Sequence, residues 1–258
     1  MGAEQPFAGR LRFSSELRYH WDRVGDVETH EAQLAVAGSW SPTDWLTLSA
    51  SMPLVVRDVR FANLSRATVV GPGDADVRGR AVLLKDRPFA PSHMLGLSAG
   101  VKLPTSVDQL GPDGALLPYD AQTGSGTVDP LAGLFYAHFA DPWSVFASAS
   151  VALPLAPRFI EAPGPSLRTS LAVQYRADDW ITVRGAIDTR LDAPARVGEG
   201  TDPSTDQLVV FLSPDLLWSP RTDMTLVLGL RVPLVQITER ARAEGLYVIG
   251  SVVVDVGS

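Results

Sequence analysis

Few residues in this sequence could carry catalytic chemistry. The chain has four histidines and no cysteine, which removes thiolate nucleophiles and cysteine-ligated metals. His20, His30, His93 and His138 lack a mutual spacing suited to a metal site, and HExxH does not occur. Ser14 and His20 are the nearest candidates for a nucleophile and a base. We therefore predict no catalytic residues, no metal site and no cofactor.

Arginines and carboxylates form a second and much larger group of reactive side chains. In residues 10–22 they fall at every second position, so that Arg12, Glu16 and Arg18 alternate with Leu11 and Leu17. A period of two indicates β-strands with one apolar and one polar face. The charged residues that we expect on the polar face are Arg12, Glu16, Arg18, Arg78, Arg80, Lys102, Arg168, Arg176, Arg184, Asp188, Arg190, Asp215 and Arg231.

The same pattern continues through the chain and predicts about twelve strands. Their expected ranges are 10–22, 29–40, 44–55, 74–84, 94–103, 127–138, 143–153, 166–176, 180–190, 206–218, 223–234 and 246–256. We expect them to form one domain over residues 1–258. The links between them alternate between short turns and longer loops, the long ones being 56–73, 104–126, 154–165 and 191–205. Because proline cannot donate to a β-ladder, Pro53, Pro104, Pro154 and Pro233 are expected at strand ends and bulges.

An even number of strands with alternating turns and loops predicts an all-β, transmembrane, antiparallel up-and-down β-barrel. A closed soluble barrel of this size would need its interior filled, whereas the apolar faces here are rich in Ala and Gly. We expect the apolar face to contact lipid in a Gram-negative outer membrane, and the charges to line the lumen. Short turns would face the periplasm and longer loops the cell exterior. Met1–Pro6 lacks the pattern of a secretory signal, so an exported protein would be represented here as its mature chain.

The six tryptophans support a membrane orientation. Five of them flank the predicted short turns, and one lies near the far end of the first strand. An indole ring is favoured at a membrane interface, where its ring is buried and its N–H is hydrated. We predict an interface girdle made of Trp21, Trp40, Trp45, Trp143, Trp180 and Trp218.

Three motifs resemble a known family of barrels. The strand end in GLSAGVKLPT at 96–105, the segment QTGSGTVDP at 122–130 and GPGDAD at 71–76 resemble the outer-membrane transporter-like family named for the phenol meta-cleavage pathway. The resemblance covers roughly the middle half of the chain. It implies an outer-membrane barrel that moves small, often hydrophobic compounds and has no catalytic residues.

The end of the chain departs from that resemblance. Such barrels usually close on an aromatic residue, whereas this sequence ends VVVDVGS. We therefore expect that the natural protein can continue past residue 258. One form of this expectation is a barrel that precedes a peptidoglycan-binding domain of the OmpA type.

Three functions remain open on the sequence alone. A net charge of −7 argues against nucleic acid as a partner, which leaves outer-membrane lipid and an unidentified solute or surface partner. A barrel of about twelve strands lies between the filled lumen of small barrels and the open channel of large ones. Two functions fit such a lumen. One is passive transport of small solutes, hydrophobic ones included. The other is a sealed barrel that acts as a membrane anchor or displays loops for adhesion. Twelve-stranded phospholipases make an enzyme conceivable, but Ser14 and His20 share the inward face, so we predict no enzyme.

Overall fold

The computed structural model describes residues 8–63, 65–111, 113–238 and 242–256. Within these ranges the chain forms sixteen strands and two short 3-10 helices. No helix in the described ranges has the length and apolar character needed to cross a membrane. Residues 1–7 and 257–258, which the single-domain prediction includes, lie outside the described residues.

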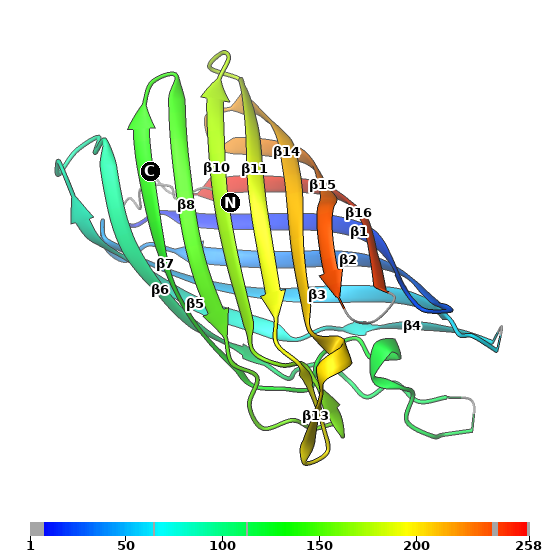
Figure 1. Cartoon of the computed structure of the whole chain (residues 1–258). Coiled ribbons are helices and arrows are strands. Elements are labelled where there is room, and N and C mark those ends of the chain that lie inside the picture. Colours follow the sequence, from blue (N-terminus) through cyan, green and yellow to red (C-terminus); the bar gives the residue numbers. More distant parts are fainter. Residues whose placement is uncertain (1–7, 64, 112, 239–241, 257–258) are drawn as a thin grey trace.

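Thirteen strands form one antiparallel sheet, which closes because β2 pairs with both β1 and β3 (Figure 1). β4 and β5 both pair with β3, at opposite ends of it, so they are two parts of one barrel strand and the barrel has twelve strands. This confirms the predicted fold class. The strands of the barrel are β1 (Leu11–Val24), β2 (Val27–Trp40), β3 (Leu46–Arg60), β4 (Arg66–Pro72), β5 (Ala75–Lys85), β6 (His93–Leu103), β7 (Asp129–Ala140), β8 (Trp143–Ala152), β10 (Ser166–Arg176), β11 (Ile181–Asp192), β14 (Gln207–Arg221), β15 (Met224–Thr238) and β16 (Arg242–Val256).

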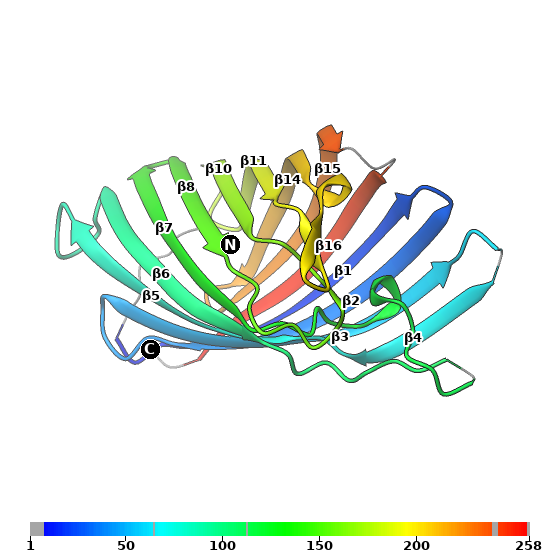
Figure 2. The ribbon, with the colours of Figure 1, turned by 60° about the horizontal axis from the view of Figure 1, so that its bottom comes forward.

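The two ends of the barrel carry different connections. One end, here called the turn end, holds the start of β1, the end of β16 and five short turns, at 41–45, 86–92, 141–142, 177–180 and 222–223. The opposite loop end carries the long connections 104–128, 153–165 and 193–206. These contain η1 (Tyr119–Ala121), η2 (Pro203–Thr205) and a three-stranded sheet of β9 (Glu161–Ala162), β12 (Ala195–Val197) and β13 (Gly200–Asp202). Figure 2 shows these segments gathered at the loop end.

One predicted loop was wrong. Residues 56–73 were expected to form a long link, but β3 continues to Arg60 and the chain returns as β4 after a turn at 61–65. The period-two pattern in fact persists there, because Val55 and Val59 point inward and are 3% and 0% exposed. The predicted strand ended at residue 55, two residues after Pro53, which lies inside β3 where its partner changes from β5 to β4.

The other three prolines lie either after the end of a strand or at an irregular position inside one. Pro104 and Pro154 follow the ends of β6 and β8, as expected. Pro233 lies inside β15, at a shift in its register with β14, which fits the expected bulge position. Proline is tolerated at such irregular positions because a backbone donor is not needed there.

The apolar face of the sheet is the outer face. Leu17, Leu134 and Leu171 are 56%, 53% and 55% exposed, as are many other large apolar side chains at alternate positions. The polar face is enclosed, because Arg190 on β11 binds Glu244 on β16 although β14 and β15 lie between these strands. A contiguous apolar exterior of this kind is unusual on a soluble protein and typical of a lipid-facing barrel wall.

A small apolar cluster fills part of the lumen towards the turn end. Val82, Met94, Phe135 and Ala137 are buried in it, and partly buried aromatic rings pack around them. Gly96 makes this packing possible: a Cβ there would lie 2.3 Å from the carbonyl oxygen of Ala81 and 2.3 Å from the Phe135 ring.

We predict that Gly96→Ala lowers the free energy of unfolding by about 1–3 kcal/mol, because the added methyl group overpacks this cluster. The measurement is the denaturant midpoint of the detergent-folded protein, followed by the mobility shift of the folded barrel on unheated gels. Gly185→Ala is the matched control, since nothing lies within 4 Å of a Cβ at that strand position. Equal midpoints for the two variants would contradict this account of the cluster.

Candidate functional site

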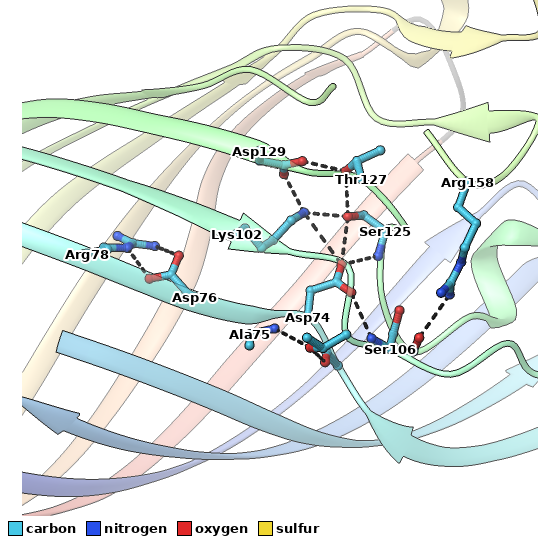
Figure 3. A network of polar contacts seen from close by, with 12 residues as sticks. Asp74, Ala75, Asp76, Arg78, Lys102, Ser106, Ser125, Thr127, Asp129 and Arg158 are labelled. Carbon is cyan, nitrogen blue, oxygen red and sulfur yellow. Dashed lines mark hydrogen bonds and ion pairs between the residues drawn. The ribbon is translucent and has the colours of Figure 1, made fainter. Parts of the chain in front are cut away.

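A buried polar network forms where β4 gives way to β5 (Figure 3). Asp74, directly before β5, accepts hydrogen bonds from the backbone N–H and the hydroxyl of Ser125 at 2.7 and 2.9 Å. Lys102 of β6 donates to Ser125 Oγ at 2.5 Å and forms an ion pair with Asp129 at 2.5 Å. Thr127 donates to the same Asp129 carboxylate at 2.6 Å. One ammonium group therefore lies between two carboxylates and is supported by hydroxyl groups.

This network fixes the connection 104–128, which we call the inner loop, against the barrel wall. Thr105 donates to the carbonyl oxygen of Gly73 at 3.0 Å, and Thr123 donates to that of Pro72 at 2.9 Å. These bonds cover the edge of β4, which has no partner from β6 because β6 ends at Leu103. An uncovered strand edge would leave backbone polar groups unsatisfied.

The inner loop also enters the lumen. η1 packs against β3, and Arg57 of β3 donates to the carbonyl oxygen of Gln122, which is 1% exposed. Gly124 allows the close approach, because a Cβ there would lie 2.4 Å from both Asp74 Oδ1 and Ser106 Oγ. The Gly124-Ser125-Gly126 segment is therefore part of a packed loop, as the sequence reading expected.

A second polar cluster crosses the lumen on the opposite side. Arg190 forms two hydrogen bonds to the Glu244 carboxylate, at 2.9 and 2.5 Å, and Tyr247 donates to the same carboxylate. The Arg231 guanidinium lies 4.1 Å above the centre of the Phe211 ring. The resulting bridge joins β11, β14, β15 and β16 through the interior.

Most of the predicted lumen-lining residues contact a partner on the polar face of the sheet. Arg80 stacks on the ring of Phe135 at 4.3 Å. Arg176 departs from the others, because it ends β10 at the turn end and pairs with Asp141 in the turn. Paired on the polar face are Arg12 with Asp255, Arg18 with Glu16, Arg78 with Asp76, Lys102 with Asp129, Arg184 with Asp215, Arg190 with Glu244 and Arg231 with Asp188.

The tryptophans lie at the ends of strands and are exposed, from 39% for Trp21 to 61% for Trp180. Trp40, Trp45, Trp143, Trp180 and Trp218 lie at or near the turn end. Trp21 lies towards the loop end, where its indole covers the backbone of Gly245. Their role as an interface girdle stays a prediction.

The histidines do not form a catalytic or metal site in the part of the chain that the structure describes. His20 stacks on Tyr247 at 4.5 Å, and no hydrogen bond joins it to Ser14. His93 stacks on His138 at 4.4 Å near the turn end. No group of three or more metal-ligating side chains occurs within the described ranges. In the adjacent turn, the backbone N–H of His93 donates to Asp86 and holds the pKa of that carboxyl below its ordinary value.

Several residues of these clusters were absent from the predicted site. Asp74, Ser125 and Asp129 belong to two of the three motifs that carried the family resemblance, and the third contains Lys102. The structure brings all three motifs together in one network. Arg57 fell in the wrongly predicted loop, and Glu244 lies just before the predicted last strand. The continued alternation of residues 55–59 could have identified Arg57.

Comparison with solved structures finds proteins of the same architecture. The chain is similar to the COG4313 outer membrane channel from Pseudomonas putida F1, with a TM-score of 0.76 and 13% identity, over 99% of each chain. It has an outer-membrane β-barrel fold. The resemblance to the phenol meta-pathway barrels is thereby confirmed at the level of fold. No protein-family model and no curated protein matched the sequence.

Two further structures share the barrel at lower similarity. The β domain of the Bordetella autotransporter BrkA has a TM-score of 0.59 and 8% identity, over 96% of this chain and 100% of that chain. The KdgM porin has a TM-score of 0.53 and 8% identity, over 95% of this chain and 99% of that chain. The fold and the apolar exterior place the protein in a bacterial outer membrane, with the turn end towards the periplasm.

We predict that Lys102→Gln destabilises the barrel by about 3–5 kcal/mol, because it leaves two carboxylates without a cation. The side chains of Asp74 and Asp129 are only 5% and 8% exposed, so water cannot replace the lost partner. The denaturant midpoint and the rate of proteolysis within residues 104–128 measure the effect. Lys85→Gln, which removes a lysine from a turn-end contact with Asp44, is the control. Equal proteolysis of both variants would show that the network does not hold the inner loop.

Proposed function

We propose that this protein is a passive channel for small solutes across the outer membrane. The observation that carries the proposal is a closed barrel whose charged residues line an interior rather than contact lipid. The similarity of its fold to that of an outer-membrane channel supports it. The KdgM porin was solved with oligogalacturonate, which provides an example of a solute in a barrel of this general shape.

The route through the lumen would pass between the inner loop and the opposite strands. The polar faces of β6, β7 and β8 carry small residues, among them Ser98, Gly133, Ser148 and Ser150. Ser148 is exposed although it lies on the polar face. Small side chains on three adjacent strands leave space for water along this side of the barrel.

A sealed scaffold is the second candidate, and one observation favours it. The inner loop and the bridge from Arg190 to Glu244 both enter the lumen, where they narrow it from two sides. A barrel closed in this way would serve as a membrane anchor that displays its loops.

Recordings from the purified full-length chain in planar lipid bilayers separate the two candidates. We predict stable unitary currents, because the small-residue side of the lumen remains hydrated. A folded protein that inserts but gives no currents would refute the channel and favour the sealed scaffold.

A double variant gives the recordings a structural control. Arg190→Ala with Glu244→Ala removes the bridge across the lumen, and the unitary conductance should rise. Arg66→Ala with Asp58→Ala removes an equally bidentate pair on the outer face, with both hydrogen bonds at 2.6 Å, and should leave conductance unchanged. An equal response of the two would mean that ions do not pass the bridge.

A further inference from the structure

Arg168 on β10 differs from the other lumenal arginines. Within the described residues it forms no hydrogen bond, ion pair or ring contact, and it is exposed on the polar face of the barrel. Its cross-strand neighbour Arg190 binds both nearby carboxylates, Glu244 at 2.5 Å and Asp192 at 2.9 Å. The five N–H donors of the Arg168 guanidinium therefore remain available to a solute.

In the lumenal ion pairs, the cationic side chain is more exposed than its carboxylate partner. The Arg78 side chain is 50% exposed and its partner Asp76 only 18%, while Lys102 is 25% exposed and Asp129 only 8%. The same order holds for Arg12 with Asp255, Arg18 with Glu16, Arg57 with Glu31, Arg184 with Asp215, Arg190 with Glu244 and Arg231 with Asp188. The contact of Arg190 with Asp192 is the exception. Although the lumenal charges nearly balance in number, a passing solute meets mainly donor groups.

The register places Arg168 beside the open side of the lumen. Ser98 pairs with Gly133, Gly133 with Ser150, and Ser150 with Arg168. On the other flank of this row, Ser98 pairs with Arg80. Among the charges near Arg168, Arg190 repels it most, Asp192 attracts it, and Arg231 and Arg78 add weaker repulsion. An anion in front of these small residues would relieve the repulsion.

An apolar cluster lies next to this row, towards the turn end. Phe135 follows Gly133 by two positions on the same face of β7 and is buried in the cluster, while Phe146 packs against the cluster and is only partly buried. A solute whose charged head lies at Arg168 could place an apolar body against the partly buried ring of Phe146. The row and the cluster together are suited to a molecule with one anionic and one apolar part.

We propose that the lumen selects small organic carboxylates with an apolar body, and that Arg168 binds the carboxylate. This inference rests on the proposed channel function and adds the class of solute to it. The oxygens of a carboxylate match the planar fork of a guanidinium, which can donate two parallel hydrogen bonds to them.

The test is the ion selectivity of the full-length protein in bilayers of zwitterionic lipid under a potassium chloride gradient. The wild-type reversal potential should show a preference for chloride over potassium. Arg168→Gln should lower that preference by about threefold or more, because one unit charge about 7 Å from an ion changes its energy by roughly RT even in water. Arg168→Lys should retain the preference. Arg66→Gln, which removes an exposed arginine from the outer face, is the matched control and should behave as wild type.

The class of solute is tested in the same bilayers with benzoate as the anion and benzylammonium as the cation. Benzoate should be the more permeant of the two in wild type, and Arg168→Gln should reduce the difference. A wild type that prefers potassium, a preference that Arg168→Gln leaves unchanged, or a higher permeability for benzylammonium would each overturn the inference while leaving the channel intact. The absence of all currents in every variant would instead refute the channel itself.

Discussion

The whole structure depends on the separation of an apolar and a charged face within one closed sheet. Each strand must satisfy its backbone donors and acceptors through its neighbours, since a bilayer offers no water to do so. Closure through the pairing of β2 with β3 meets that requirement around the barrel. The alternation along each strand then decides the chemistry, because the side that contacts lipid is apolar and every arginine on the other side becomes lumenal.

Enclosing so many charges creates a second requirement, which is that each carboxylate has a partner. The lumen meets it with guanidinium groups and hydroxyl groups that cover the carboxylates and leave the cations nearer to water. The network of Asp74, Lys102 and Asp129 gives two carboxylates their cation. The hydrogen bonds around this network also hold the inner loop over the unpaired edge of β4. A single set of contacts thus completes the barrel wall and narrows the passage.

The fold was predictable from the sequence because its signal is strictly local. Alternation in segments such as 10–22 and 166–176 identified twelve barrel strands, most of them to within a few residues. The break between β4 and β5 was not predictable in the same way, since the pairing of β3 with two successive partners is a long-range property. Pro53 in particular gave a misleading signal, because a proline can lie at a change of partner as well as at a strand end.

The side of the sheet on which a charged residue lies follows from its parity along the strand, whereas its pairing does not. Parity placed Arg168, Arg184 and Arg190 on one face, but it gave no means of telling that Arg190 would reach Glu244 across two strands while Arg168 met no partner among the described residues. Such contacts depend on the curvature of the closed barrel. The motifs around Gly73, Lys102 and Ser125 were recognised as a resemblance, and their physical meaning emerged only when the structure brought them together.

The most direct test of the central claim uses the absence of cysteine from the chain. Single cysteines introduced by Leu171→Cys and Ser170→Cys place a spin label at adjacent positions of β10 in a reconstituted bilayer. The account predicts that the label at 171 collides mainly with dissolved oxygen from the lipid and the label at 170 mainly with a water-soluble nickel complex. The reverse order, with the leucine position facing water and the serine position facing lipid, would contradict it.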